Sequence, residues 1–281
     1  MPPLTTISHR HHVYRDASLS PRVASDPAGA EAASLTGVKG VLFDCYNTLI
    51  DICTDEERRE TYARLSAWLL PRGVSIEPLR LQQEYRCCTA AQMKQCRDSF
   101  PEIRIEGIFS DICGRYAVDR IDAIELGGEC AREFRESSLI RRRAFPQSIR
   151  LLEHLKGLPM GIVSNGQRVF SEGELRRLGL FPYFDVVVFS SDLGVQKPNP
   201  RIYRTALDSL GLKPQEVLFV GDSLECDVLG PRKMGMRSLF IHDAWKIPEG
   251  HETLSPLPAA GLSKPELPLL PLRSPASYRP A

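Results

Sequence analysis

Several features that mark special classes of protein are missing from this sequence. It has no uninterrupted apolar run of about 18 residues, the length that a membrane-spanning helix needs, so we expect no membrane partner. Its 36 Lys and Arg are balanced by 35 Asp and Glu, so the overall charge gives no reason to expect nucleic acid as a partner. Recognition of an anion must therefore depend on a local arrangement of residues.

The eight cysteines are not spaced like metal ligands or like a disulfide framework. No two of them form a CxxC pair, and none has the Cys/His spacing of a zinc site. Scattered thiols in a chain of 281 residues favour a reducing compartment. The first residues lack the apolar stretch of a secretory signal, although their Arg and Ser content leaves a transit peptide as an alternative. We expect a cytoplasmic protein.

The composition changes along the chain divide it into four parts. Residues 1–36 have no sustained apolar period and are predicted to form a disordered tail. The proline-rich residues 247–281 are predicted to be extended, either as a plain tail or as a weak binding site for a protein partner that recognises proline. Between the tails we expect a catalytic core at 37–52 and 143–246, interrupted by a helical cap at 53–142.

Short apolar runs bounded by turn residues predict the strands of the core. The runs are VKGVLFD at 38–44, PMGIVS at 159–164, FDVVVFS at 184–190, EVLFVGD at 216–222 and SLFIHD at 238–243. Such runs are typical of parallel strands that are buried on both faces. Helical patterns lie between them, at 148–155, 171–178, 200–210 and 224–234. This alternation predicts a doubly wound parallel α/β sheet.

The inserted block at 53–142 has a different pattern, because its apolar residues recur at helical spacing and no strand-like run interrupts them. The four amphipathic segments are ERRETYARLSAWLL, PLRLQQEYRCCTAAQMKQC, IEGIFSDICGRYA and AIELGGECAREF. Since the block follows the first strand directly, we interpret it as a lid over the residue that ends that strand.

Polar residues stand where the predicted strands end. Asp44 ends the first strand, Ser164 ends the second within SNG, and Asp222 ends another within GDSLECD. Lys197 follows the FDVVVFS strand after a short loop. Each residue alone is typical of a turn, a helix cap or a solvated charge. Ligands of open α/β sheets bind outside the carboxyl ends of the strands, so the recurrence of such residues there predicts a site.

This set of residue types suits phosphoryl transfer to an aspartate. Asp44 can act as the nucleophile and form an aspartyl-phosphate that water hydrolyses. Asp44 and Asp222 offer oxygen ligands for Mg²⁺. Lys197 would neutralise the charge that the nucleophile and the phosphate share. Asp227 would fall in the first turns of the next helix, either as a ligand through a water or as a group behind the ligands.

Phosphate oxygens need hydrogen-bond donors around them. We assign this role to the side chains and backbone N–H groups of four residues, Thr48, Ser164, Asn165 and Gly166.

Four segments of the chain resemble the four motifs of the haloacid dehalogenase (HAD) superfamily of hydrolases. They are FDCYNTLID, IVSNG, GVQKPNPRIY and GDSLECD, and the resemblance covers about residues 38–242, with a helical insertion like that of the C1-cap subgroup. It implies a Rossmann-like core, Asp44 as nucleophile, Mg²⁺ dependence in the phosphatase members and substrate choice controlled by the cap. It also implies that the backbone carbonyl of Tyr46 is a metal ligand.

Tyr46 is the departure from the phosphatase pattern, which usually has a second aspartate there as general acid and base. Tyrosine, with an ordinary pKa near 10, is a poor substitute. The D-x-Y-x-T-L pattern resembles the metal-independent 2-haloacid dehalogenases instead. Those enzymes replace the first acid of GDSLECD, however, and this chain keeps both Asp222 and Asp227.

The sequence therefore predicts first a Mg²⁺-dependent phosphatase of a small phosphorylated metabolite. A 2-haloacid dehalogenase is the first alternative, with Arg72 and Arg80 of the cap as candidates for holding a substrate carboxylate. A weakly active or regulatory phosphate-binding protein is the second. The cap is rich in arginine, and sequence alone does not say which of these side chains face the site. Among them are Arg58, Arg86, Arg115 and Arg135.

Overall fold

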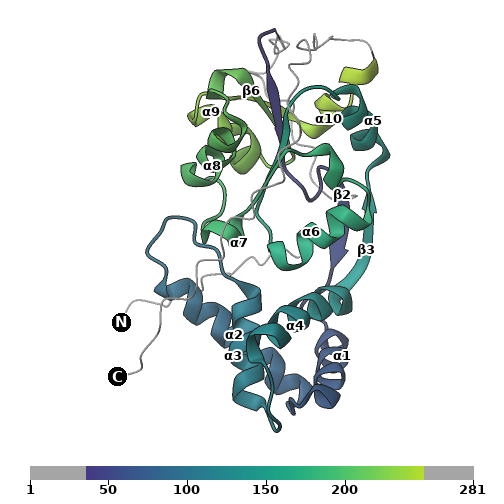
Figure 1. Cartoon of the computed structure of the whole chain (residues 1–281), viewed down its shortest axis with the longest axis vertical. Coiled ribbons are helices and arrows are strands. Elements are labelled where there is room, and N and C mark those ends of the chain that lie inside the picture. The colour runs from purple at the N-terminus through teal and green to yellow at the C-terminus, as the bar shows by residue number, and fades with distance from the viewer. Residues whose placement is uncertain (1–35, 250–281) are drawn as a thin grey trace, which may run out of the picture.

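The computed structural model describes residues 36–249, and its core is a five-stranded parallel sheet with the order β5-β4-β1-β6-β7 (Figure 1). The strands are β1 (Gly40–Phe43), β4 (Met160–Ser164), β5 (Val186–Phe189), β6 (Val217–Gly221) and β7 (Arg237–Phe240). All five predicted strands are present in parallel pairing, which confirms the doubly wound α/β fold.

Helices cover both faces of this sheet because the strands are apolar on both sides. In β1, Val41 and Phe43 pack on one side with residues of α5, α6 and α10, whereas Leu42 packs on the other side with residues of α8. The helices of the core are α5 (Pro146–His154), α6 (Arg168–Arg177), α7 (Ser190–Leu193), α8 (Pro200–Leu210), α9 (Gly230–Lys233) and α10 (Ile241–Ala244). Two apolar layers therefore enclose the sheet.

The inserted block forms a separate helical layer at the carboxyl end of the sheet, in the lower half of Figure 1. Its helices are α1 (Arg59–Leu69), α2 (Pro78–Gln95), α3 (Ile105–Tyr116) and α4 (Ala123–Ser138), with a short 3₁₀ helix, η2 (Leu70–Arg72), between the first two. Tyr62, Tyr85, Phe109 and Phe134 lie in one buried cluster of their own. Val169 and Phe170 of α6 pack against that cluster from the core.

The expectation that no strand interrupts the inserted block is wrong at its two ends. β2 (Ile50–Thr54) and β3 (Leu139–Ala144) pair antiparallel and lie between the core and the cap (Figure 1). Neither shows an apolar run, because Asp51 interrupts β2 and three arginines occupy β3, and Asp51 pairs with two of those arginines. The chain thus enters and leaves the cap through neighbouring strands.

Two further elements differ from the prediction. The run SLFIHD was expected to be a strand throughout, but β7 ends at Phe240 and the next residues form α10. The helix expected at 224–234 is a short π-helix, η5 (Leu224–Leu229), followed by α9, because Gly230 and Pro231 interrupt a regular helix. Short 3₁₀ helices also occur, as η3 (Phe181–Tyr183), η4 (Pro214–Glu216) and η6 (Ile247–Glu249).

The predicted tails lie almost wholly outside the described residues. The exception is the start of the second tail, because η6 belongs to the folded part and Ile247 is buried in the core. Within residues 36–249, no helix is long and apolar enough to cross a lipid bilayer.

Candidate active site

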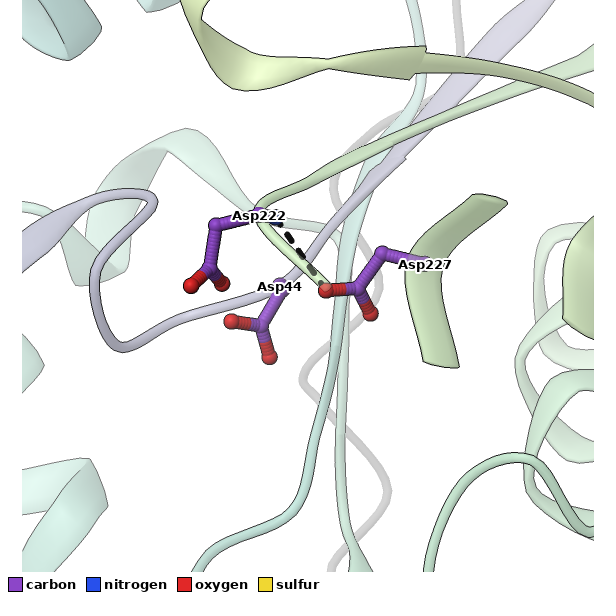
Figure 2. Close-up of side chains that lie close together, drawn as sticks. All are labelled: Asp44, Asp222 and Asp227. Carbon is purple, nitrogen blue, oxygen red and sulfur yellow. Dashed lines mark hydrogen bonds between the residues drawn. The ribbon is translucent and has the colours of Figure 1, made fainter. Parts of the chain in front are cut away.

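Three acidic side chains meet at the carboxyl edge of the sheet. Asp44 follows β1 and Asp222 follows the neighbouring strand β6, while Asp227 comes from η5 (Figure 2). One carboxylate oxygen from each residue lies within 4.8 Å of the others. The sequence places these residues at one edge, and the structure brings their carboxylates together.

Lys197 is the positive charge in this cluster. Its Nζ donates to Oδ1 of Asp44 and to Oδ1 of Asp227, both at 2.7 Å, and the residue is only 3% exposed. Burial alone would lower the pKa of Lys197, but the charges of Asp227 and Asp44 outweigh it and raise that pKa. The ammonium form is therefore retained at neutral pH, and it holds the Asp44 carboxylate in place.

Asp227 is fixed by the backbone that follows β6. Its Oδ2 accepts hydrogen bonds from the N–H groups of Asp222 (3.2 Å) and Ser223 (2.9 Å). A Cβ atom at Gly221 would lie 2.4 Å from the Asp227 carboxyl carbon, so only glycine allows this approach. The Ser223 hydroxyl accepts from Cys226 N and caps η5.

The electrostatics of the three carboxylates fit a divalent cation. Crowding by neighbouring protein atoms, which removes part of its hydration, and then the negative charges of Asp44 and Asp227 raise the pKa of Asp222, although its side chain stays exposed to solvent. The same loss of hydration raises the pKa of Asp227 to about 6 in spite of Lys197. One ammonium is therefore not enough to balance the acids, and hard oxygen donors of this kind suit Mg²⁺.

Of the residues predicted to hold phosphate, Thr48 contacts the acidic cluster, and Asn165 and Gly166 are engaged by other protein groups. Thr48 Oγ1 lies 3.4 Å from Asp222 Oδ1. Asn165 braces the loop of Lys197, because its Oδ1 accepts from Lys197 N (2.7 Å) and its Nδ2 donates to Lys197 O (3.3 Å). The N–H of Gly166 donates to Ser190 Oγ (2.9 Å). Ser164 is buried at the end of β4.

A family model of the haloacid dehalogenase-like hydrolases matches residues 38–235, which carry the sheet edge, the acidic cluster and the cap. This chain belongs to that family.

Curated relatives are similar over shorter stretches. A glyceraldehyde 3-phosphate phosphatase of Methanopyrus kandleri is 39% identical over 101 residues, which are 35% of this chain and 43% of the relative. A phosphoserine phosphatase of Thermus thermophilus is 33% identical over 124 residues, 42% of this chain and 50% of the relative. The chain thus spans half or less of the length of these two relatives.

Among solved structures, a 2-haloacid dehalogenase from Pseudomonas syringae pv. tomato superimposes with a TM-score of 0.52 at 24% identity. The match covers 80% of this chain and 91% of that one. At this level of identity the likeness shows the HAD fold alone.

In this HAD hydrolase the Tyr46 side chain lies beside the site but is bound to other groups. Its hydroxyl donates to Glu174 Oε2 (2.6 Å) and lies 2.7 Å from Ser171 Oγ. Burial raises the pKa of Tyr46 well above its ordinary value, and the residue is 4% exposed. A tyrosine in this state is a weaker acid than usual, and its proton is directed toward Glu174.

Sequence reasoning did not identify Glu174 or Glu102 as residues of the site's surroundings. Glu102, in the loop between α2 and α3, accepts from Ser190 Oγ (2.7 Å) and Gln196 Nε2 (3.1 Å). Ser190 also accepts from the N–H of Gly166, one of the residues predicted to hold phosphate. Glu102 of the cap is therefore linked to that residue through Ser190. No local pattern marks either glutamate, because each has partners far away in the sequence.

Most of the arginines considered for the cap point to cap residues. Arg80 and Arg115 pair with Glu84, and Arg86 pairs with Glu57. Arg72 stacks on Trp68, with its guanidinium carbon 3.8 Å from the ring centre. Arg135 is different, because it is only 4% exposed and pairs with Glu174 of the core at 2.8 Å.

Proposed function

We propose that this HAD hydrolase is a phosphatase that acts on a small phosphorylated metabolite through an aspartyl-phosphate on Asp44. The observation that carries the proposal is the buried Lys197 between Asp44 and Asp227, with Asp222 beside them. The names of the two curated relatives support it.

Asp44 has the surroundings that a nucleophile needs. Lys197 binds its Oδ1, and within residues 36–249 no hydrogen bond is made to its Oδ2. In the first step an Asp44 oxygen forms a bond to phosphorus, while the bond from phosphorus to the leaving oxygen breaks and that oxygen takes a proton from solvent. In the second step water attacks phosphorus, loses a proton to solvent and releases the Asp44 carboxylate.

We propose Mg²⁺ as the cofactor, held by Asp44, Asp222 and the backbone carbonyl of Tyr46, with Asp227 as a ligand through a water or as a group behind the ligands. The unbalanced charge of the three carboxylates supports this choice. When bound, the ion would supply positive charge next to the phosphate. Lys197 then restrains Asp44, and Thr48, Ser164, Asn165 and Gly166 remain the proposed donors to phosphate.

Dehalogenation is the second candidate, because Tyr46 matches the D-x-Y-x-T-L pattern. The acidic cluster argues against it, since attack on carbon has no use for a divalent cation site. We also propose a cytoplasmic location, which the eight cysteines support because their spacing fits neither a disulfide framework nor a zinc site.

The test is release of phosphate from p-nitrophenyl phosphate and acetyl phosphate. We expect turnover with Mg²⁺, loss of activity in EDTA, and a loss of at least about 10³-fold in Asp44→Asn, which removes the nucleophilic carboxylate. Asp243→Asn is the matched control, since Asp243 is an exposed acid paired with Lys246, and it should keep full activity. Metal-independent release of chloride from 2-chloropropionate would support the second candidate instead. Binding of Mg²⁺ and phosphate analogues without turnover would indicate a regulatory protein.

A further inference from the structure

Four side chains from separate parts of the chain meet beside the loop that follows β1. Tyr46 of that loop donates to Glu174 of α6 at 2.6 Å. Arg135 of α4, in the cap, donates to Glu174 Oε1 at 2.8 Å, and Arg142 of β3 donates to the same oxygen at 3.2 Å. Core, cap and connecting strand thus share one carboxylate.

Burial makes this carboxylate depend on its partners. Glu174 is 2% exposed, and a charge in such a place is costly unless it is paired and hydrogen-bonded. Arg142 divides its charge between Glu174 and the more exposed Glu136. Arg135 is buried with Glu174, and the nearest second acid, Glu56, lies 3.9 Å away. The cap arginine is therefore the main counter-charge of Glu174.

The same cluster fixes the side chain that stands two residues after Asp44. The Arg135 guanidinium carbon lies 5.2 Å from the centre of the Tyr46 ring. On another side, a Cβ placed on Gly166 would be 3.4 Å from Tyr46 Cε2, so the ring lies against the loop that follows β4. Within residues 44–50, the N–H groups of Asn47, Leu49 and Ile50 bond inside the loop. The Tyr46 side chain is the part of this loop that contacts the cap arginine and Glu174.

We propose that Glu174 is a positioning residue, which couples docking of the cap helix α4 to the ordering of the Asp44 loop. When Arg135 docks, its charge balances that of the Glu174 carboxylate, which accepts the hydrogen bond of the Tyr46 hydroxyl. The ordered loop then keeps Asp44 in contact with Lys197. When α4 moves away, Glu174 loses its main counter-charge, and the Tyr46 ring loses its contact with the Arg135 guanidinium. The effect on turnover rests on the proposed function, but the effect on loop order does not.

Hydrogen–deuterium exchange of the whole protein tests the coupling directly. In Arg135→Met we expect the amides of residues 45–50 to exchange at least about 10-fold faster, although they belong to the core. Arg115→Met is the matched control, since it removes an arginine that pairs with Glu84 inside the cap, and it should leave these amides unchanged. Arg135→Lys should restore most of the protection.

Kinetics with p-nitrophenyl phosphate give the second measurement. Glu174→Gln keeps the shape of the side chain but removes its charge, and we expect kcat to fall about 10-fold or more while KM changes by less than about 3-fold. If Glu174→Gln does not fold, Tyr46→Phe replaces it, since this change removes only the hydroxyl that Glu174 binds. Exchange at residues 45–50 and the kinetics are then measured on Tyr46→Phe.

Unchanged exchange at 45–50 in Arg135→Met would overturn the proposal, and so would an equal increase in Arg115→Met. If the unaltered protein hydrolyses no phosphate compound, the proposed function fails, whereas the exchange experiment still decides whether Glu174 couples the cap to the loop.

Discussion

At the scale of single residues, the Tyr46 hydroxyl bears on the kind of phosphate compound that the proposed phosphatase would cleave. Its proton is directed to Glu174, so it does not protonate a leaving oxygen. Loss of general acid catalysis typically slows a reaction by about 10²- to 10⁴-fold, and the loss is smallest for leaving groups that need no proton. We therefore expect the proposed phosphatase to favour aryl and acyl phosphates over alkyl phosphates.

We predict a steep dependence of kcat/KM on the pKa of the leaving group. Alkyl phosphates should react at least about 100-fold more slowly than p-nitrophenyl phosphate or acetyl phosphate. In Tyr46→Phe the rates should fall for all substrates while the slope of the plot stays the same, because the hydroxyl is not the acid. Equal rates for alkyl and aryl phosphates would contradict this prediction, and a series of substituted phenyl phosphates measures the slope.

Asp44 and Asp222 of the acidic cluster were predictable because each one directly follows an apolar strand. Asp44, Asp222 and Lys197 could be placed at one edge from strand order alone, and their contacts agree with that placement. Glu174 and Arg135 could not, since each lies in a charged stretch of helix like many others. Glu174 is 128 residues from Tyr46 in the sequence, and it is 39 residues from Arg135. Their contacts with each other become visible only in the folded structure.

At the scale of elements, the β2–β3 pair is held by one acid between two arginines. Arg141 Nη2 donates to Asp51 Oδ1 at 2.9 Å and Arg143 Nε donates to Oδ2 at 2.8 Å. Burial opposes the charged form of Asp51, but the hydrogen bonds from Arg141 and Arg143 outweigh it and lower the pKa of Asp51. The ionised carboxylate therefore stabilises the pair of strands.

We predict that Asp51→Asn lowers the free energy of unfolding by about 1 to 2 kcal/mol near neutral pH, a modest value because Arg143 is exposed to water. Because the folded pKa is below the unfolded value of 3.8, the stabilisation is complete above that value. It should be lost as the pH falls through the folded pKa. Denaturant unfolding at pH 7 and at pH 3 measures this, and an equal difference between the two proteins at both values would contradict it.

The elements that sequence reasoning missed share a physical cause. β2 and β3 carry charged residues that are paired across the strands, so their pattern has no apolar run. α10 follows β7 directly, and its first residue, the buried Ile241, extends the apolar run of the strand into the helix. In both places tertiary contacts, rather than local propensity, decide the conformation.

At the scale of the whole molecule, the charge in the site is linked to the stability of the fold. The pKa of Asp222 is raised, so its ionised form costs stability in the absence of a cation, and the cost is modest because the side chain is exposed and screened by water. That cost grows as the pH rises from the ordinary value through the folded pKa. A ligand that binds only the folded state adds about 2.7 kcal/mol at a concentration of 100 times its Kd.

We predict that Mg²⁺ raises the melting temperature at pH 8 and that EDTA reverses the rise. In Asp222→Asn the melting temperature without Mg²⁺ should be higher than that of the unaltered protein, because one negative charge is gone, and the response to Mg²⁺ should be small. Differential scanning calorimetry with Mg²⁺, EDTA and Na⁺ at equal ionic strength tests this. A Mg²⁺ response that survives Asp222→Asn would place the ion elsewhere.

The division of the chain into a core and a helical cap could be predicted from the sequence, because the two parts have different apolar patterns. The helical period of the insertion predicts its four long helices, and the structure has them at α1–α4. The contact between cap and core could not be predicted from the sequence. It involves Val169 and Phe170, two adjacent apolar residues in the otherwise mostly polar helix α6.

The narrow attachment of the cap has a consequence for how such enzymes diversify. Thr54 and Leu139 are paired neighbours, so the whole insertion leaves and returns at one point. A tight turn that joins them would close the ribbon without disturbing the order of the five-stranded sheet. Replacing one insertion by another of different size would therefore reshape the space above Asp44 while the sheet that carries Asp44 keeps its order, but the new insertion would have to supply its own partner for Glu174.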